Sequence, residues 1–165
     1  MLMENNRIQE FSETVIQINR ISKKTKGGNQ IRFSALVVVG DRKGKVGVGL
    51  GKAPNVVSGI RKAISQAKKN LIVVPFKGTT IPYQISVKYG AAKLLLKPAP
   101  AGSGIVAGGP LRAVFESAGV KDVIAKILGS NSKTANLYAA MEALTKLSEL
   151  GEKQEFIKRN KENAK

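Results

Sequence analysis

A glycine-rich stretch in the middle of the chain, GSGIVAGGPLR (residues 102–112, the glycine stretch), has the composition of a loop that could hold a phosphate. A helical pattern opens at Pro110, and the free backbone amides at the start of a helix favour anions. Glycines also adopt positive φ and let another group approach the backbone closely. The residues of this stretch that could contact a partner are Gly102, Gly104, Gly108, Gly109 and Arg112.

The two common nucleotide motifs do not fit this stretch. The dinucleotide fingerprint G-x-G-x-x-G has two residues between its second and third glycines, whereas this chain has three between Gly104 and Gly108. Two prolines also separate the glycines from the preceding strand pattern. The phosphate loop G-x-x-x-x-G-K-S/T fails because alanine follows Lys52. The stretch then either packs a helix tightly onto a sheet, or presents a helix start and Arg112 to an acidic protein or an RNA phosphate. The sequence alone leaves both of these roles open.

Catalytic residue types are scarce. The chain has no cysteine and no histidine, which removes thiolate metal sites, the commonest general base and every histidine-dependent triad. Asp41 is a lone carboxylate in a turn pattern, and we interpret it as a turn-former. The sequence therefore predicts no enzyme, no metal site and no cofactor. The lack of cysteine fits a reducing, cytoplasmic compartment, and no apolar run is long enough to span a membrane.

The basic residues are concentrated in one part of the chain. The 165 residues include 28 Lys and Arg against 11 Asp and Glu, a net charge of +17. Between Thr14 and Phe115 there are 18 basic residues and one acid, whereas the rest of the chain is neutral overall. Like charges repel in a compact protein, so a polyanionic partner is expected to neutralise them. Because the bases are spread over strand and helix patterns, a nucleic acid is a better partner than a membrane.

Two basic segments would carry the contacts, although either alone could be a solvated surface. The loop at 20–32 is rich in lysine and glycine and could reach into a groove. The helix pattern RKAISQAKKN could grip phosphates across a groove. No tryptophan accompanies these bases, so structured RNA recognised by shape and phosphates is expected. The predicted RNA-binding residues are Arg20, Lys23, Lys24, Lys26, Gly27, Gly28, Arg42, Lys45, Lys52, Arg61 and Lys62.

The apolar pattern that must position these residues predicts two small α+β domains. Alternating apolar residues indicate three strands, at 13–22, 30–40 and 44–52, and a helix from Pro54 whose apolar stripe extends to Leu71. This gives a β-β-β-α order, with one helix on the back of a sheet. The same order and a basic helix occur in double-stranded-RNA-binding domains.

A segment rich in proline and glycine, 75–82, marks the boundary between the domains. Beyond it a strand pair is expected at 83–98, then a helix near 110–119 and a helix over 130–150 that ends before Gly151. Residues 120–129 between these helices are expected to form a strand, with a helix as the alternative. The expected division is a flexible N-terminus (1–10), an N-terminal domain (11–75), a C-terminal domain (76–150) and a charged tail (151–165).

Three segments, VIQINRISKKTKGG, FSALVVVGDRKGKVGVGLGKA and GSGIVAGGPLRAVFESAGVKDVIAKILGSN, resemble the family of bacterial small-subunit ribosomal protein five, in unbroken order over about residues 11–148. The resemblance implies an N-terminal domain related to double-stranded-RNA binders and a C-terminal domain with a left-handed β-α-β crossover. It also implies a non-enzymatic, structural role on ribosomal RNA in the small subunit, at the head–body junction, with an effect on the accuracy of decoding.

The resemblance also implies partners and sites. The partners are small-subunit ribosomal RNA and the neighbouring ribosomal proteins four and eight, with messenger RNA nearby. The loop Ser22–Asn29 would lie near the binding place of spectinomycin, and Gly102–Arg112 would contact protein four. Two other functions stay as alternatives: a free chaperone of double-stranded RNA, and a nucleotide-dependent transferase suggested only by the fold superfamily of the C-terminal domain.

Overall fold

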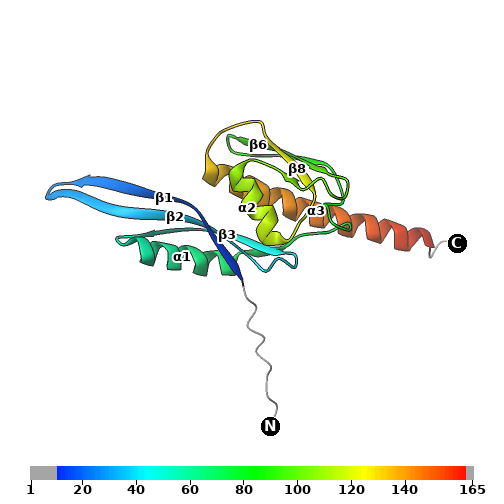
Figure 1. Ribbon diagram of the computed structural model, residues 1–165, viewed down its shortest axis with the longest axis horizontal. Coiled ribbons are helices and arrows are strands. Elements are labelled where there is room, and N and C mark those ends of the chain that lie inside the picture. Colours follow the sequence, from blue (N-terminus) through cyan, green and yellow to red (C-terminus); the bar gives the residue numbers. More distant parts are fainter. Residues whose placement is uncertain (1–10, 163–165) are drawn as a thin grey trace, which may run out of the picture.

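The computed structural model describes residues 11–162, and side chains as far as 153 (Figure 1). Residues 11–162 form two sheets and three helices. In order the elements are β1 (Ser12–Thr25), β2 (Gly28–Gly40), β3 (Lys45–Ala53), α1 (Val56–Lys69), β4 (Leu71–Val73), β5 (Ile85–Tyr89), β6 (Ala92–Pro98), β7 (Ile105–Val106), α2 (Gly109–Ala118), β8 (Val123–Ile127) and α3 (Lys133–Glu162).

The N-terminal sheet is antiparallel, in the order β1-β2-β3-β4, and α1 covers one of its faces. Glycines of β3 make this packing unusually close. A Cβ atom placed on Gly47, Gly49 or Gly51 would lie 2.0–2.3 Å from carbonyl oxygens of α1. The expected strands and helix are confirmed. The alternating glycines of β3 form the surface on which α1 packs.

The expected helix extension to Leu71 is wrong. α1 ends at Lys69, and Leu71–Val73 form the edge strand β4 beside Lys45–Gly47. Asn70 donates its backbone N–H to two carbonyls at the helix end and turns the chain back. Leu, Ile and Val suit a strand as well as a helical stripe, and pairing with β3 decides between the two.

The second face of the N-terminal sheet is also buried, because the C-terminal domain packs on it. Leu36, Val38, Val46 and Val48 belong to one apolar cluster with residues of α2, α3 and the second sheet, such as Phe115. The run Ser34–Gly40 is therefore buried on both faces. Simple alternation predicted only one buried face for this strand.

The C-terminal sheet has the order β5-β6-β8-β7, with β7 parallel to β8 and the other pairs antiparallel. The expected strand pair, the short helix α2 and the strand β8 are confirmed. Gly119 adopts φ +88° at the C-cap of α2, as its position indicated. β7 has only two residues and lies inside the glycine stretch, where no strand was expected. It completes a β7-α2-β8 unit, whose left-handed crossover remains a prediction.

The last helix is longer than its sequence suggested. α3 continues through Gly151 to Glu162, so the prediction that Gly151 ends it is wrong. A glycine inside a helix costs only about 1 kcal/mol, and the glutamates, lysines and glutamine on either side are good helix formers. The tail 151–165 thus begins as a continuation of α3 (Figure 1). None of the helices within residues 11–162 is long and apolar enough to cross a membrane.

Candidate nucleic-acid interface

β1 and β2 extend past β3 and α1 as a two-stranded arm (residues 19–32, the arm), clearly seen projecting in Figure 1. Every residue of the arm is exposed. At its tip the Thr25 hydroxyl donates a hydrogen bond to the carbonyl of Gly28 over 2.7 Å, and Gly28 has φ +127°. Nothing lies within 4 Å of where side chains at Gly27 and Gly28 would begin. The tip is open on all sides.

One face of the arm holds a cationic hollow of about 220 Å³ (the arm hollow), lined by Ile21, Lys23, Gln30, Arg32 and Lys52. Strand register explains the grouping. Residue 21 pairs with 32, 23 with 30, and 34 with 52, so these side chains share one face. Ala35 and Gly51, one residue along each strand, face α1. The arm hollow is therefore on the sheet face that points away from α1.

Three of the residues in the arm hollow are positively charged, and no carboxylate of the described residues lines it. Lys23 and Lys52 were predicted from sequence; Arg32 was not. A signal was available, because Arg32 alternates with Phe33, Ala35 and Val37 and therefore lies on the opposite face of β2 from the residues that pack against α1. Arg20 and Lys24 fall on the other face of the arm, and Lys26 is at its tip. The predicted arm residues are thus brought together in one element but divided between two faces.

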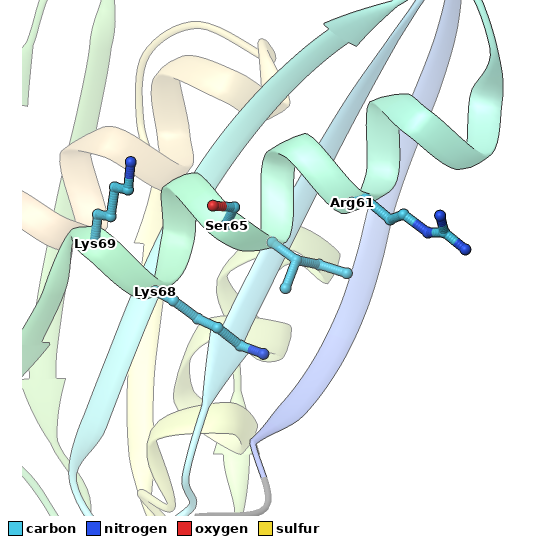
Figure 2. A pocket seen from close by; sticks show the side chains of 5 residues that line it. Arg61, Ser65, Lys68 and Lys69 are labelled. Carbon is cyan, nitrogen blue, oxygen red and sulfur yellow. The ribbon is translucent and has the colours of Figure 1, made fainter.

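A second cationic hollow, of about 420 Å³, lies along α1, where Lys68 reaches Glu13 of β1 (the α1 hollow). Figure 2 shows the side chains of Arg61, Ser65, Lys68 and Lys69 projecting from this helix, and Ile64 completes the lining of the hollow. Lys68 forms an ion pair with Glu13 at 2.9 Å and lies 5.7 Å above the ring of Phe11. α1 contains no acidic residue, and no ion pair involves Arg61 or Lys69 within residues 11–153. The predicted residue Lys62 is exposed on the same helix but does not line the hollow.

Arg42 and Lys45 lie apart from both hollows. Arg42 is in the turn at the opposite end of β2 from the arm tip, and Lys45 is the first residue of β3. Asp41 shapes this turn: its carboxylate accepts the backbone N–H groups of Lys43 and Lys45 at 2.8 and 2.9 Å. The interpretation of Asp41 as a turn-former is confirmed.

The same turn is joined to the C-terminal domain through backbone contacts. The N–H of Arg42 donates to the carbonyl of Ser117, and that of Gly44 to Ala118, each over 2.9 Å. Gly119 leaves room for this contact, because a Cβ there would lie 2.1 Å from the carbonyl oxygen of Arg42. The backbone of Arg42 is thus fixed at the domain junction, while its side chain is exposed.

The glycine stretch is organised around a carboxylate of the protein itself. Asp122, only 4% exposed, accepts the backbone N–H groups of Gly102 and Gly104 at 3.0 and 2.9 Å. The Thr79 side chain also donates to this carboxylate. That hydrogen bond, with those from the two glycines, lowers the pKa of Asp122 below its ordinary value of 3.8 against the opposing effect of desolvation. The amides that resembled a phosphate loop already hold an anion.

Arg112 is engaged locally as well. Its Nε lies 2.9 Å from a carboxylate oxygen of Glu116, one helical turn on, and both side chains are more than half exposed. Gly102 and Gly104 have φ of +89° and +70°, so both need the freedom of glycine. Gly108 precedes α2 as its N-cap, and Gly109 begins it. The glycine stretch therefore packs within the protein, which was one of the two roles that the sequence left open. Its exposed side remains available to a partner.

No group of histidine, cysteine and acidic side chains suited to a metal occurs in the part of the chain that the structure describes. A protein with two exposed cationic hollows, a projecting basic arm and this helix-covered sheet has the features of an RNA-binding protein.

Comparisons with known proteins agree with that class. Residues 11–75 match the family model for the N-terminal domain of ribosomal protein S5, and residues 87–155 match the model for its C-terminal domain. The chain is 49% identical to small ribosomal subunit protein uS5 of Campylobacter jejuni over 145 residues, which cover 88% of this chain and 99% of the relative. This chain belongs to the ribosomal protein S5 family.

Proposed function

We propose that the arm hollow is a principal surface by which this member of the S5 family binds the RNA of the small ribosomal subunit. As a member of that family, the chain is a structural, ribosomal-RNA-binding component of the small subunit. The observation that supports the arm hollow is its charge: Lys23, Arg32 and Lys52 converge on one exposed face, with no carboxylate of residues 11–153 among them. Such a surface attracts phosphates and releases their counterions.

The chemistry of the arm favours shape and backbone recognition. Gln30 offers a donor and an acceptor to a ribose hydroxyl, and Ile21 offers apolar contact with a sugar. The arm has no aromatic residue apart from Phe33 just beyond its base, so stacking on unpaired bases contributes little. The further contacts that we propose are the phosphate contacts predicted from sequence, made by Arg20, Lys24, Lys26, Arg42, Lys45, Arg61 and Lys62.

We further propose that the glycine stretch meets ribosomal protein four, and that ribosomal protein eight and messenger RNA lie close to the chain. The support is that Asp122 holds the stretch in one conformation, while Gly102, Gly108, Gly109 and Arg112 stay exposed. A rigid exposed loop loses little entropy on docking. An influence on the accuracy of decoding would follow from that position, with no catalytic step in the chain.

A salt titration of RNA binding tests the arm hollow. In a variant carrying Lys23→Ala, Arg32→Ala and Lys52→Ala, the slope of log K against log salt for small-subunit ribosomal RNA should be shallower by about 2.7, since each duplex phosphate contact contributes about 0.9. A control with Lys88→Ala, Lys133→Ala and Lys146→Ala loses the same charge from the C-terminal domain. Equal slopes for both variants would mean that only net charge matters.

Sedimentation tests residence on the ribosome. The protein should remain with small subunits through a sucrose gradient at moderate salt, and the arm variant should be released at lower salt than the control. A chain that leaves the subunits yet still binds free RNA duplexes would instead be the chaperone.

A further inference from the structure

The C-terminal sheet packs against helices on one of its two faces. Leu94, Leu96 and Ala125 point toward α2 and α3 and belong to the apolar cluster that they form. These two helices contact both sheets and lie between them (Figure 1). Successive side chains of a strand point to opposite faces, so the neighbours of these residues make up a second face, directed away from the N-terminal sheet (the outer face).

Four lysines stand on the outer face without an acidic partner. They are Lys88, Lys93, Lys97 and Lys126, and all four are exposed. None of them forms an ion pair within residues 11–153. The only carboxylates in the sequence from 83 to 128 belong to Glu116 and Asp122, which are engaged by Arg112 and by backbone amides. The outer face is therefore purely cationic.

Aliphatic side chains lie among these lysines. Leu95 pairs with Lys126, and Ile124 pairs with both Lys97 and Val106 across neighbouring strands. Val106 is 56% exposed, and Leu128 at the end of the same face is 51% exposed. RNA phosphates gain nothing from aliphatic contacts, and none of the described residues on this face offers an aromatic ring on which a base could stack.

Such a mixture matches a protein segment that carries both carboxylates and apolar side chains. Carboxylates would pair with the lysines, and apolar side chains would cover Leu95, Ile124 and Val106. A second copy of this chain does not fit, because two purely cationic faces repel each other. Charge complementarity therefore selects an acidic partner.

The dimensions of the outer face suit a short helix. Four strands about 4.8 Å apart span roughly 14 Å, and three rows of outward side chains span about 14 Å along the strands. A helix rises about 1.5 Å per residue, so roughly ten residues cross this face. A helix placed there would form a third layer, as in sheets that have helices on both sides. Stable complexes bury about 1,200 Å² or more, so so small a contact is typical of a transient partner.

We propose that the outer face is a docking surface for an acidic amphipathic helix of another protein, which binds it transiently. The inference is independent of the proposed RNA site. The layer of α2 and α3 separates the outer face from the N-terminal sheet, so RNA bound at the arm hollow leaves the face accessible. The chain would thus be able to hold RNA and an acidic protein at the same time.

A designed peptide tests the proposal. The probe is a fluorescently labelled peptide of about 15 residues, long enough to form a helix, with glutamate and leucine on one side and alanine and glutamine on the other. It is titrated with the full-length chain, and binding is followed by fluorescence anisotropy. We expect saturable binding that a peptide of the same composition in scrambled order does not show.

Variants of the outer face then locate the bound peptide. Lys93→Glu with Lys126→Glu should weaken binding about tenfold, because two attractive pairs become repulsive. Val106→Ser with Leu128→Ser should weaken it several-fold. The control, Lys133→Glu with Lys153→Glu, makes the same charge change on α3 and should leave binding nearly unchanged. All of these side chains are exposed, so the thermal midpoints should stay close to that of the unaltered chain.

The other outcomes overturn the proposal. Equal binding of the scrambled peptide, or equal weakening by the outer-face and control lysine variants, would mean that only net charge matters. If Lys93→Glu with Lys126→Glu lowers affinity for small-subunit RNA more than the control does, the outer face is an RNA surface and the docking proposal is wrong. The arm hollow is tested separately, because its own variant leaves the outer face intact and should bind the peptide normally.

Discussion

The tip of the arm and the glycine stretch differ in what surrounds their backbones. Around Gly27 and Gly28 there is open solvent, and the neighbouring lysines have no carboxylate partner within residues 11–153. Around Gly102 and Gly104 the amide groups are bound by the buried carboxylate of Asp122. Glycine serves both loops by permitting positive φ, but only the arm leaves its charges unsatisfied. Unpaired charged groups in a loop, more than its glycine content, therefore indicate a binding surface.

RNA affinity tests this contrast most strongly. Replacing Lys23, Lys24 and Lys26 by alanine should reduce the salt dependence of RNA binding by up to about 0.9 for each phosphate contact that the lysines make. Because these side chains are exposed, the thermal midpoint should not move. An unchanged affinity for small-subunit RNA would show that the arm tip does not touch the RNA, and a lowered midpoint would show that it supports the fold.

The next effect concerns the anchor of the glycine stretch. Asp122→Asn removes the charge that two glycine amides and Thr79 stabilise, so the thermal midpoint should fall by several degrees at neutral pH. RNA affinity at a temperature where both proteins are folded should stay the same. Glu116→Gln, which removes an exposed carboxylate, is the matched control and should have little effect on the midpoint.

The pH dependence of that loss has a definite sign. The pKa of Asp122 in the folded protein is below its ordinary value of 3.8, so the stabilisation is complete well above pH 3.8 and is lost as the pH falls toward the lower, folded value. The difference in midpoint between the native chain and Asp122→Asn should therefore shrink in acid. A difference that is constant from neutral pH down to the acid range would mean that the charge of Asp122 plays no part.

A smaller effect compares single glycines in the two loops. Gly104→Ala places a side chain at φ +70° and should cost about 1–2 kcal/mol of unfolding free energy. Gly27→Ala meets no atom within 4 Å and requires no positive φ, so its change should lie within about 0.5 kcal/mol. Urea denaturation of both variants measures this. Equal losses would remove the contrast between an anchored and an open loop.

Arg112→Ala should have the weakest effect of all. Exposed ion pairs four residues apart on a helix contribute about 0.3–0.5 kcal/mol, so the loss of the pair with Glu116 should change stability by no more than this. Affinity for RNA should be unaffected if the stretch faces a protein. A drop in RNA affinity as large as that of an arm lysine would place the glycine stretch on RNA and end its contrast with the arm.

Local patterns predicted most elements of the fold, and tertiary contacts decided the rest. Alternation located β2, but its residues Leu36 and Val38 are buried by the C-terminal domain, which period-two spacing in one strand cannot reveal. β4 has three residues and β7 has two, so neither strand is long enough to show a hydrophobic period in the sequence. Gly151 was predicted to end the last helix, but good helix formers lie on both sides of it and α3 continues to Glu162.

For the candidate site, the sequence located the charge but not its grouping. The alternation of β2 places Arg32 on the face away from α1, but its position beside Lys23 and Lys52 depends on strand register. Asp122 carried a signal too, because it is the first acidic residue after α2. Its role depends on amides 18 and 20 residues away, a contact that only the folded β7-α2-β8 unit creates.

The apolar cluster that runs through both domains also determines how the chain loses its structure. Taken alone, the N-terminal domain would expose Leu36, Val38, Val46 and Val48 to water, and the C-terminal domain would expose the facing side of α2. Each half matches a family model of its own, but the two share one apolar cluster. The protein should therefore melt in one cooperative calorimetric transition, with both halves unfolding together as a single thermodynamic unit.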